Sequence, residues 1–150
     1  MNSEGSLSFA KEVTTLMPLI LRRAFKTQIH ALSKLNITLP QVIILEAIAE
    51  KGSCNMGELA TVLELSMGSV TGIVDKMIEQ GFVKRERSVE DRRIVHVVCL
   101  EKGRKALDVI GNTRVNAVSG MFEILDNAEK KEYLRILKKI YEGIRIKNEL

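Results

Sequence analysis

The sequence predicts a mainly α-helical domain with one small β-hairpin. Apolar residues recur at intervals of three and four through most of the 150 residues, which is the period of an amphipathic helix. Between residues 82 and 99 the pattern changes to two short runs rich in β-branched residues, with a polar segment between them. Apolar residues make up 45 % of the chain, enough for a hydrophobic core, and the length suits a single domain over residues 1–150.

The first two helices are expected over residues 7–34 and 40–50. Pro18 interrupts the first pattern, so it should either kink that helix or mark the start of a second piece. Thr38, followed three residues later by Gln41, forms a capping box, which is typical of a helix N-terminus. A short connection therefore separates the two helices.

Two shorter helices follow, joined by a turn of three residues. Asn55 and Glu58 repeat the capping signature and open a helix over residues 56–63. Ser66 is a good N-cap for a helix over residues 67–80. Apolar residues at spacings of four and three give this last helix one buried face, formed by Val70, Val74 and Met77.

A basic hairpin comes next, with strands expected over residues 82–87 and 94–99 and a polar tip over 88–93. Two short helices followed by such a hairpin form the layout of a winged helix-turn-helix. A helix of this kind can enter the major groove of DNA, and the thin β-loop can reach the backbone or the minor groove. The basic residues of the hairpin are Lys84, Arg85, Arg87, Arg92 and Arg93.

Helical spacing resumes over residues 101–125 and 128–147. In the last helix the apolar residues form a 4-3-4 seam, which dimerisation explains better than membrane binding. The residues of this seam are Tyr133, Leu137, Ile140 and Ile144.

The residues around the second short helix suit contact with DNA. Small polar side chains at its start can donate to phosphates or touch base edges, and the helix N-terminus itself favours a phosphate. Arginine at a loop tip suits a narrow, electronegative minor groove. A solvated hairpin held by salt bridges is the plainer interpretation, but its position directly after a helix-turn-helix favours DNA.

Several segments, in this order, resemble the MarR family of bacterial and archaeal regulators, and the similarity covers nearly the whole chain. The Asp91-Arg92-Arg93 wing, followed by a strand and Lys102-Gly103, is the most specific part. The other matching segments are Thr38-Leu39-Pro40-Gln41, Gly57-Glu58-Leu59-Ala60, Leu65-Ser66, Ser69-Val70-Thr71, Val74-Asp75-Lys76-Met77 and Gly81-Phe82-Val83.

The resemblance implies an obligate homodimer. Residues 6–35 and 101–150 would form the dimerisation helices, and residues 38–100 would form the DNA-binding lobe. The two lobes would bind double-stranded DNA at a pseudo-palindromic operator whose half-sites lie about one DNA turn apart. The resemblance also implies sequence-specific transcriptional regulation, with repression that a small anionic or phenolic effector relieves.

The resemblance assigns the DNA contacts by position. Residues of the second short helix would serve the major groove or its phosphates, Arg93 would enter the minor groove, and Asp91 would orient that arginine. The residues expected at DNA are Ser66, Gly68, Ser69, Thr71, Gly72, Lys76, Arg85, Arg92 and Arg93.

Gly72 departs from the family pattern, because many members carry arginine or another long polar residue there. A glycine removes a possible base-reading group and destabilises a helix by about 1 kcal/mol relative to alanine. Gly68 adds a second weak point one turn earlier. Close approach of the backbone to DNA and tolerated drift explain the two glycines equally well, so the base preference cannot be taken from relatives.

Two alternative functions remain open at this stage. Cys54 is expected to be partly exposed near a helix N-terminus, where a thiol pKa is lowered, so a redox-sensing regulator is one alternative. Cys99 is more simply a buried strand residue. A winged helix that binds an acidic protein partner is the second alternative, and the salt dependence of duplex binding separates it from DNA recognition.

The remaining sequence features favour a DNA-binding protein without a cofactor. The net charge is +4, and the chain shows no phosphate loop, nucleophile elbow or paired-histidine metal motif, so we expect neither an enzyme nor a metal site. No run of 18 apolar residues and no basic-then-apolar N-terminal signal occur. A cytoplasmic protein that does not bind membranes is therefore expected.

Overall fold

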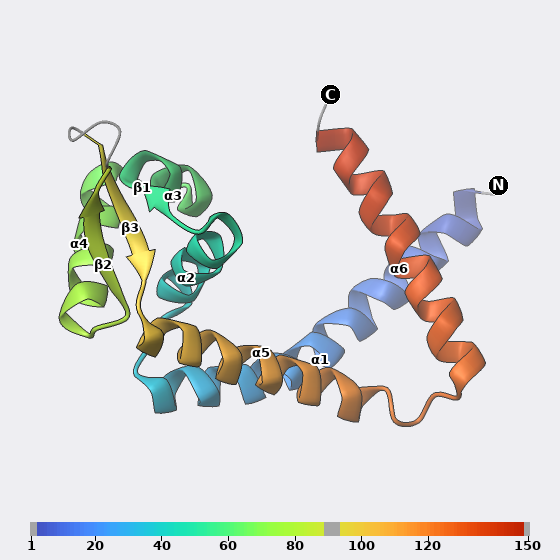
Figure 1. Cartoon of the computed structure of the whole chain (residues 1–150). Helices are drawn as coiled ribbons and strands as arrows, with labels where there is room; N and C mark the ends of the chain where they lie inside the picture. Colours follow the sequence, from blue (N-terminus) through green and yellow to red (C-terminus); the bar gives the residue numbers. More distant parts are fainter. Residues whose placement is uncertain (1–2, 89–93, 149–150) are drawn as a thin grey trace. The chain divides into compact units, whose positions relative to one another are not determined.

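The computed structural model describes residues 3–88 and 94–148, which form six helices and three strands (Figure 1). The mainly helical class with a small antiparallel hairpin is confirmed. The chain divides into two compact units, Met1–Arg114 and Val115–Leu150. The elements are α1 (Ser3–Leu35), α2 (Leu39–Lys51), β1 (Cys54–Asn55), α3 (Met56–Leu63), α4 (Met67–Glu79), β2 (Val83–Arg87), β3 (Val95–Cys99), α5 (Glu101–Met121) and α6 (Asn127–Asn148).

The three strands form one antiparallel sheet in the order β1-β3-β2. The sequence predicted β2 and β3 from their period, but it did not predict β1. Two residues are too few to show a strand period, and Asn55 was assigned only as a helix cap. Cys54 of β1 pairs with Val97 of β3, and both side chains are fully buried. β1 therefore fixes one edge of the sheet to the core.

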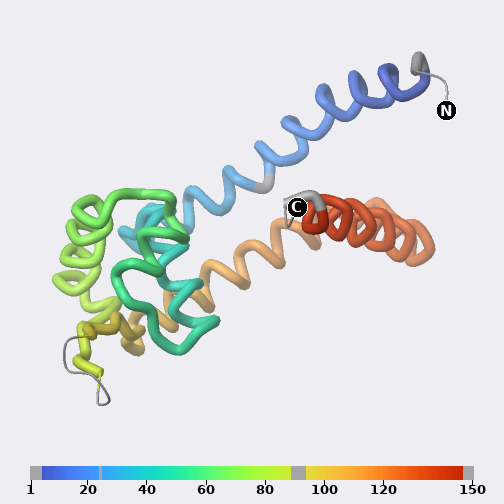
Figure 2. The backbone as a smooth tube through the Cα atoms, turned by 90° about the horizontal axis from the view of Figure 1, so that it is seen from above, coloured from blue at the N-terminus to red at the C-terminus, as the bar shows by residue number. Residues whose placement is uncertain are grey.

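α2 forms the centre of the core. It contacts α3, α4 and β3, and the three helices gather in one group beside the hairpin (Figure 1, Figure 2). Six of its 13 residues are buried, Ile44, Leu45 and Ile48 among them. The row of α4 that the sequence predicted to be buried is fully buried: Val70, Val74 and Met77. The core thereby leaves the opposite side of α4 facing outward.

Hydrogen bonds confirm the N-caps that the sequence indicated. Asn55 Oδ1 accepts from the Glu58 N–H at 2.9 Å, and Glu58 Oε2 accepts from the Asn55 N–H at 2.8 Å, which completes a capping box. At the start of α2, Gln41 Oε1 accepts from the Thr38 N–H at 2.9 Å. These caps place the helix starts within a residue of their predicted positions.

α1 runs through Pro18 as one helix of 33 residues, so a separate second piece does not exist. Its C-terminal end packs against the core through Leu32 and Leu35. Towards its N-terminus many large apolar side chains are exposed within the chain. These exposed residues are Leu7, Phe9, Leu16, Met17, Leu19, Ile20, Leu21, Phe25 and Ile29.

α5 ends at Met121, although the sequence predicted a helix as far as residue 125. Asp126 Oδ1 accepts from the Glu129 N–H at 2.9 Å, and Glu129 Oε2 accepts from the Asp126 N–H at 2.8 Å. This capping box, which the sequence analysis missed, starts a new helix and forces a turn before it. The Phe122 and Tyr133 rings, 4.8 Å apart, pack across that turn.

Gly103 lies where α5 approaches the lobe most tightly. A Cβ atom at this position would lie 2.5 Å from Phe82 O, 2.7 Å from Cys99 Sγ and 3.0 Å from Leu45 Cδ2. Real Cβ atoms do not approach backbone so closely, so a side chain would force the helix away from the hairpin. This contact explains why glycine follows Lys102.

We expect Gly103→Ala to lower the free energy of unfolding by about 2 kcal/mol, the usual magnitude for overpacking, as measured by urea denaturation. Gly111→Ala in the same helix is the matched control, because a Cβ there has no neighbour within 4 Å. The control should keep or raise stability, by up to about 1 kcal/mol. Equal effects of the two variants would contradict the close-approach explanation.

Candidate nucleic-acid interface

α3 and α4 are joined by a turn of three residues. Glu64 adopts a left-handed conformation (φ 54°), and the N–H of Leu65 bonds to Ala60 O at 3.1 Å, which ends α3. Ser66 then caps α4 by accepting from the Ser69 N–H at 3.3 Å. The helix-turn-helix that the sequence predicted is therefore formed by local signals at both ends of the turn.

The structure brings six of the predicted site residues together on one exposed side of α4 and its cap. Every one of them is exposed, and they lie opposite the buried row of the helix. They are Ser66, Gly68, Ser69, Thr71, Gly72 and Lys76. Because the core occupies the other side, this is the side of α4 that can meet a large ligand.

The hydroxyl groups at the start of α4 are partly engaged within the chain. Ser66 Oγ lies 3.0 Å from Ser69 Oγ, so one of the two donates to the other and one hydroxyl proton remains free. Thr71 Oγ1 donates to Met67 O at 2.8 Å. Thr71 therefore presents an acceptor lone pair and a methyl group, and the helix start offers fewer donors than its composition suggests.

Packing within the chain does not require either glycine of this surface. A Cβ atom at Gly68 or Gly72 would have no neighbour within 4 Å. Their effect is to leave the middle of the exposed side of α4 without side chains. The backbone of α4 is correspondingly accessible there.

The cations beside α4 differ in how they are held. Arg85 Nη1 of β2 lies 2.7 Å from Asp75 Oδ1 of α4, so this predicted site residue also ties the hairpin to the helix. Lys84 pairs with Glu86 at 2.6 Å. Within the described part of the chain, no ion pair involves Lys76 or Arg87, and both are exposed.

The tip of the hairpin lies outside the described residues. The structure gives no position for Asp91, Arg92 or Arg93, which the sequence analysis placed at the wing. The strands on either side of the tip, β2 and β3, are described and paired.

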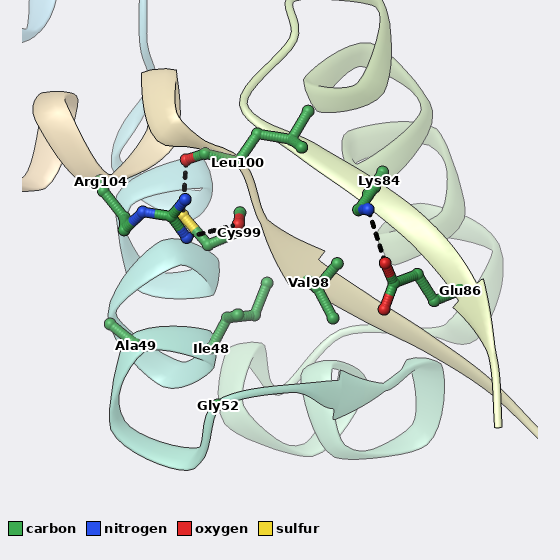
Figure 3. A pocket seen from close by; sticks show the side chains of 9 residues that line it. All are labelled: Ile48, Ala49, Gly52, Lys84, Glu86, Val98, Cys99, Leu100 and Arg104. Carbon is green, nitrogen blue, oxygen red and sulfur yellow. Dashed lines mark hydrogen bonds and ion pairs between the residues drawn. The ribbon is translucent and has the colours of Figure 1, made fainter. Parts of the chain in front are cut away.

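An open cavity of about 540 Å³ lies on the far side of the sheet, and no sequence pattern indicated it (Figure 3). Its walls come from α2, β2, β3 and the first turn of α5, which are far apart in the sequence. The lining residues are Ile48, Ala49, Gly52, Lys84, Glu86, Val98, Cys99, Leu100 and Arg104. The cavity thus combines apolar surface with two cations and one carboxylate.

Arg104 is fixed at the rim of this cavity. Its Nη1 donates to Cys99 O at 2.9 Å, and its Nε donates to Glu101 at 3.2 Å. More than half of its side-chain surface stays exposed, as does half of that of Lys84. Both cations can therefore reach a molecule in the cavity without leaving their present partners completely.

The expectation that Cys54 is exposed and reactive is wrong. Its side chain is fully buried in β1, and burial raises the pKa of the thiol, to which the nearby carboxylate of Glu58 adds. The strand pairing of β1, which the sequence did not reveal, turns this thiol into the core. Cys99 lies on β3 as expected but is only half-buried, and burial raises the pKa of its thiol as well.

Among the described residues, no group of three or more His, Cys, Asp or Glu side chains could hold a metal ion. No single described helix is long and apolar enough to cross a membrane, although α1 and α2 together pass that test as a bent pair, by length and composition only.

The comparisons with known proteins agree on one family. The model of the MarR family matches residues 37–95. The Bacillus subtilis protein YwhA, described as an uncharacterized HTH-type transcriptional regulator, is 34 % identical over 97 residues, which cover 65 % of this chain and 70 % of YwhA.

Solved structures show the same fold. A MarR family protein from Bacillus stearothermophilus has a TM-score of 0.79 at 24 % identity and covers 97 % of this chain and 99 % of its own. A mutant of Staphylococcus aureus MepR, bound to an oligodeoxyribonucleotide, has a TM-score of 0.70 at 15 % identity over 87 % and 96 %. Bordetella bronchiseptica BpsR, whose DNA binding is regulated by 6-hydroxynicotinic acid, has a TM-score of 0.61 at 19 % identity over 89 % and 95 %.

Because the thiolate is the reactive form and both thiol pKa values are raised, we expect peroxide to leave DNA affinity unchanged within about twofold in a mobility-shift assay. As a control, urea-unfolded protein should react rapidly with a chromogenic thiol reagent that labels the native protein slowly. A loss of affinity above about tenfold that Cys99→Ser abolishes would instead support the redox-sensing alternative.

Proposed function

The chain belongs to the MarR family and is a DNA-binding transcriptional regulator, and we propose that it acts as a homodimeric repressor released by a small effector. One observation carries the proposal. The exposed side of α4 begins at a capped N-terminus and bears small polar residues and a lysine, opposite a row that is fully buried. A helix with this division inserts its outer side into the major groove while its inner side stays in the core.

The proposed contacts follow from the groups that each residue leaves free. The Ser66–Ser69 pair offers one hydroxyl donor to a phosphate, and Thr71 offers an acceptor and a methyl group to base edges. Gly68 and Gly72 allow the backbone of α4 to approach the groove closely.

The cations complete the proposed surface. Lys76 contacts a phosphate, and Arg85 keeps Asp75 while its remaining N–H groups reach the DNA backbone. Arg92 and Arg93 at the wing enter the minor groove. Because Gly72 removes a base-reading side chain, we assign a larger share of the specificity to the wing and to DNA shape.

A second copy of the chain is the proposed partner of the outer helices, residues 6–35 and 101–150, around a DNA-binding lobe over residues 38–100. α6 supports this arrangement, because the predicted seam of Tyr133, Leu137, Ile140 and Ile144 is exposed in the single chain. The apolar side chains of α1 are exposed in the same way. Exposed apolar surface of this extent marks a protein interface. A dimer that binds a pseudo-palindromic operator in the cytoplasm follows from the family.

The cavity on the far side of the sheet is the site that we assign to the effector. Its volume of about 540 Å³ lies within the range of small-molecule pockets. Val98 and Leu100 offer apolar contact to an aromatic ring, and Arg104 offers N–H groups to a carboxylate or phenolate. The regulation of BpsR by 6-hydroxynicotinic acid supports this chemical class.

We expect Ser69→Ala and Arg93→Ala each to weaken binding to a selected operator duplex about tenfold, since each removes one DNA contact. Lys76→Gln should weaken binding to all duplexes and reduce the slope of affinity against salt by about one. Lys105→Gln removes the same charge from α5 and is the matched control. Binding that stays intact in the first two variants, or that does not depend on salt, would favour the protein-interaction alternative.

We expect the free protein to bind 2-naphthoate in a calorimetric titration and to bind neutral 2-naphthamide at least about tenfold more weakly, because only the acid pairs with Arg104. Ala49→Phe, which fills the cavity from an exposed position of α2, should abolish binding. Arg104→Gln should weaken it, whereas Lys105→Gln, one residue along, should not. Equal affinity of Ala49→Phe and the unchanged protein would refute the assignment of the cavity.

A further inference from the structure

The C-terminal end of α4 is held by the side chain of one residue, Gln80. Gln80 Oε1 accepts from Gln41 Nε2 at 2.8 Å, and Gln80 Nε2 donates to Asn36 O at 2.9 Å. Gln80 is the C-cap residue of α4. A single amide therefore connects the end of this helix to α2 and to the residue that follows α1.

The partner of Gln80 in α2 is itself fixed. Gln41 is 2 % exposed and is the buried polar side chain in the described part of the chain. Its Oε1 accepts from the Thr38 N–H at 2.9 Å, so both ends of its amide are used. Because an unpaired buried amide is costly, Gln41 holds Gln80 in one position.

The main chain of Gln80 provides a third connection. Lys102 Nζ of α5 donates to Gln80 O at 2.6 Å and lies 4.9 Å from the centre of the Phe82 ring. The residues that meet at position 80 are separated from it by 44, 39 and 22 positions in the sequence. The end of α4 is thus bound to α1, α2 and α5 at one point.

The distance from this point to the start of α4 makes the direction of the helix sensitive to it. α4 has 13 residues, so its capped start lies about 20 Å from the pinned end at about 1.5 Å per residue. A tilt of about 10° at Gln80 would move that start by about 3 Å, close to the rise of one base pair. The buried row fixes which side of α4 faces outward, and the pinned end fixes where the helix points.

We propose that Gln80 is a positioning residue that sets the direction of α4 relative to α1 and α5, and thereby the spacing between the two operator half-sites that the dimer accepts. The inference rests on the proposed homodimer, because spacing has a meaning only when two lobes bind together. Gln80 acts through α4 and needs no DNA contact of its own.

The test compares Gln80→Ala with the unchanged protein on three kinds of duplex. The first is the full operator selected from random DNA, the second has one half-site scrambled, and the third has the half-sites one base pair closer or farther apart. Gln80→Ala removes both side-chain bonds and keeps the carbonyl that Lys102 contacts. Affinity is measured by mobility shift, stability by urea and the oligomeric state by sedimentation equilibrium.

We expect Gln80→Ala to lose about tenfold in affinity for the full operator and less than about twofold for the single half-site, with a changed preference for spacing. A lost DNA contact or a weakened core would lower both affinities equally. Glu79→Gln, the exposed neighbour, is the matched control and should leave the ratio of the two affinities unchanged. An unchanged ratio in Gln80→Ala overturns the proposal.

Two further outcomes keep the test decisive. If Gln80→Ala does not fold, Gln80→Glu replaces it, because it keeps the acceptor for Gln41 and loses the donor to Asn36. The ratio should then change in the same direction. If the unchanged protein is a monomer when it binds the operator, the proposed homodimer fails together with this inference, whereas an unchanged ratio in a dimer rejects this inference alone.

Discussion

The burial of Val70, Val74 and Met77 is the constraint on which the DNA-binding surface depends. Once this row packs into the core around α2, the opposite side of α4 must face outward. The residues on that side need only be compatible with a helix and with a groove, and their small size meets both conditions. Stability and recognition are therefore assigned to different faces of one helix, and each face can change without the other.

Local signals account for most of what the sequence predicted correctly. Capping residues, helical spacing and the change of period located α2, α3, α4 and the hairpin, because each signal acts within a few residues. The features that were missed join distant segments: β1 on β3, Asp75 with Arg85, and Gln41 with Gln80. Nothing near Cys54 in the sequence indicates the partner strand that buries it. The cavity escaped prediction for the same reason, since four elements line it.

The interface of α4 is chemically sparse, and this bears on how the protein can select its DNA. The serine pair retains one free hydroxyl proton, Thr71 has used its own, and Gly68 and Gly72 contribute backbone alone. Such a helix gains affinity from close approach and phosphate contact more readily than from base-specific hydrogen bonds. Selectivity must then come from where the two lobes are held and from the shape of the DNA between and beside them.

The first turn of α5 is the place where that geometry is set. Three consecutive residues bind the lobe there: Lys102 to Gln80 O, Gly103 against Phe82 O, and Arg104 to Cys99 O. Because Gly103 leaves no space for adjustment, the first turn of α5 and the hairpin move as one body. A ligand at Arg104 and the amide of Gln80 would then act on the same joint, one from the cavity and one from the end of α4. Control of DNA binding by either route needs no change in the contact residues themselves, because a small rotation at this joint is enough.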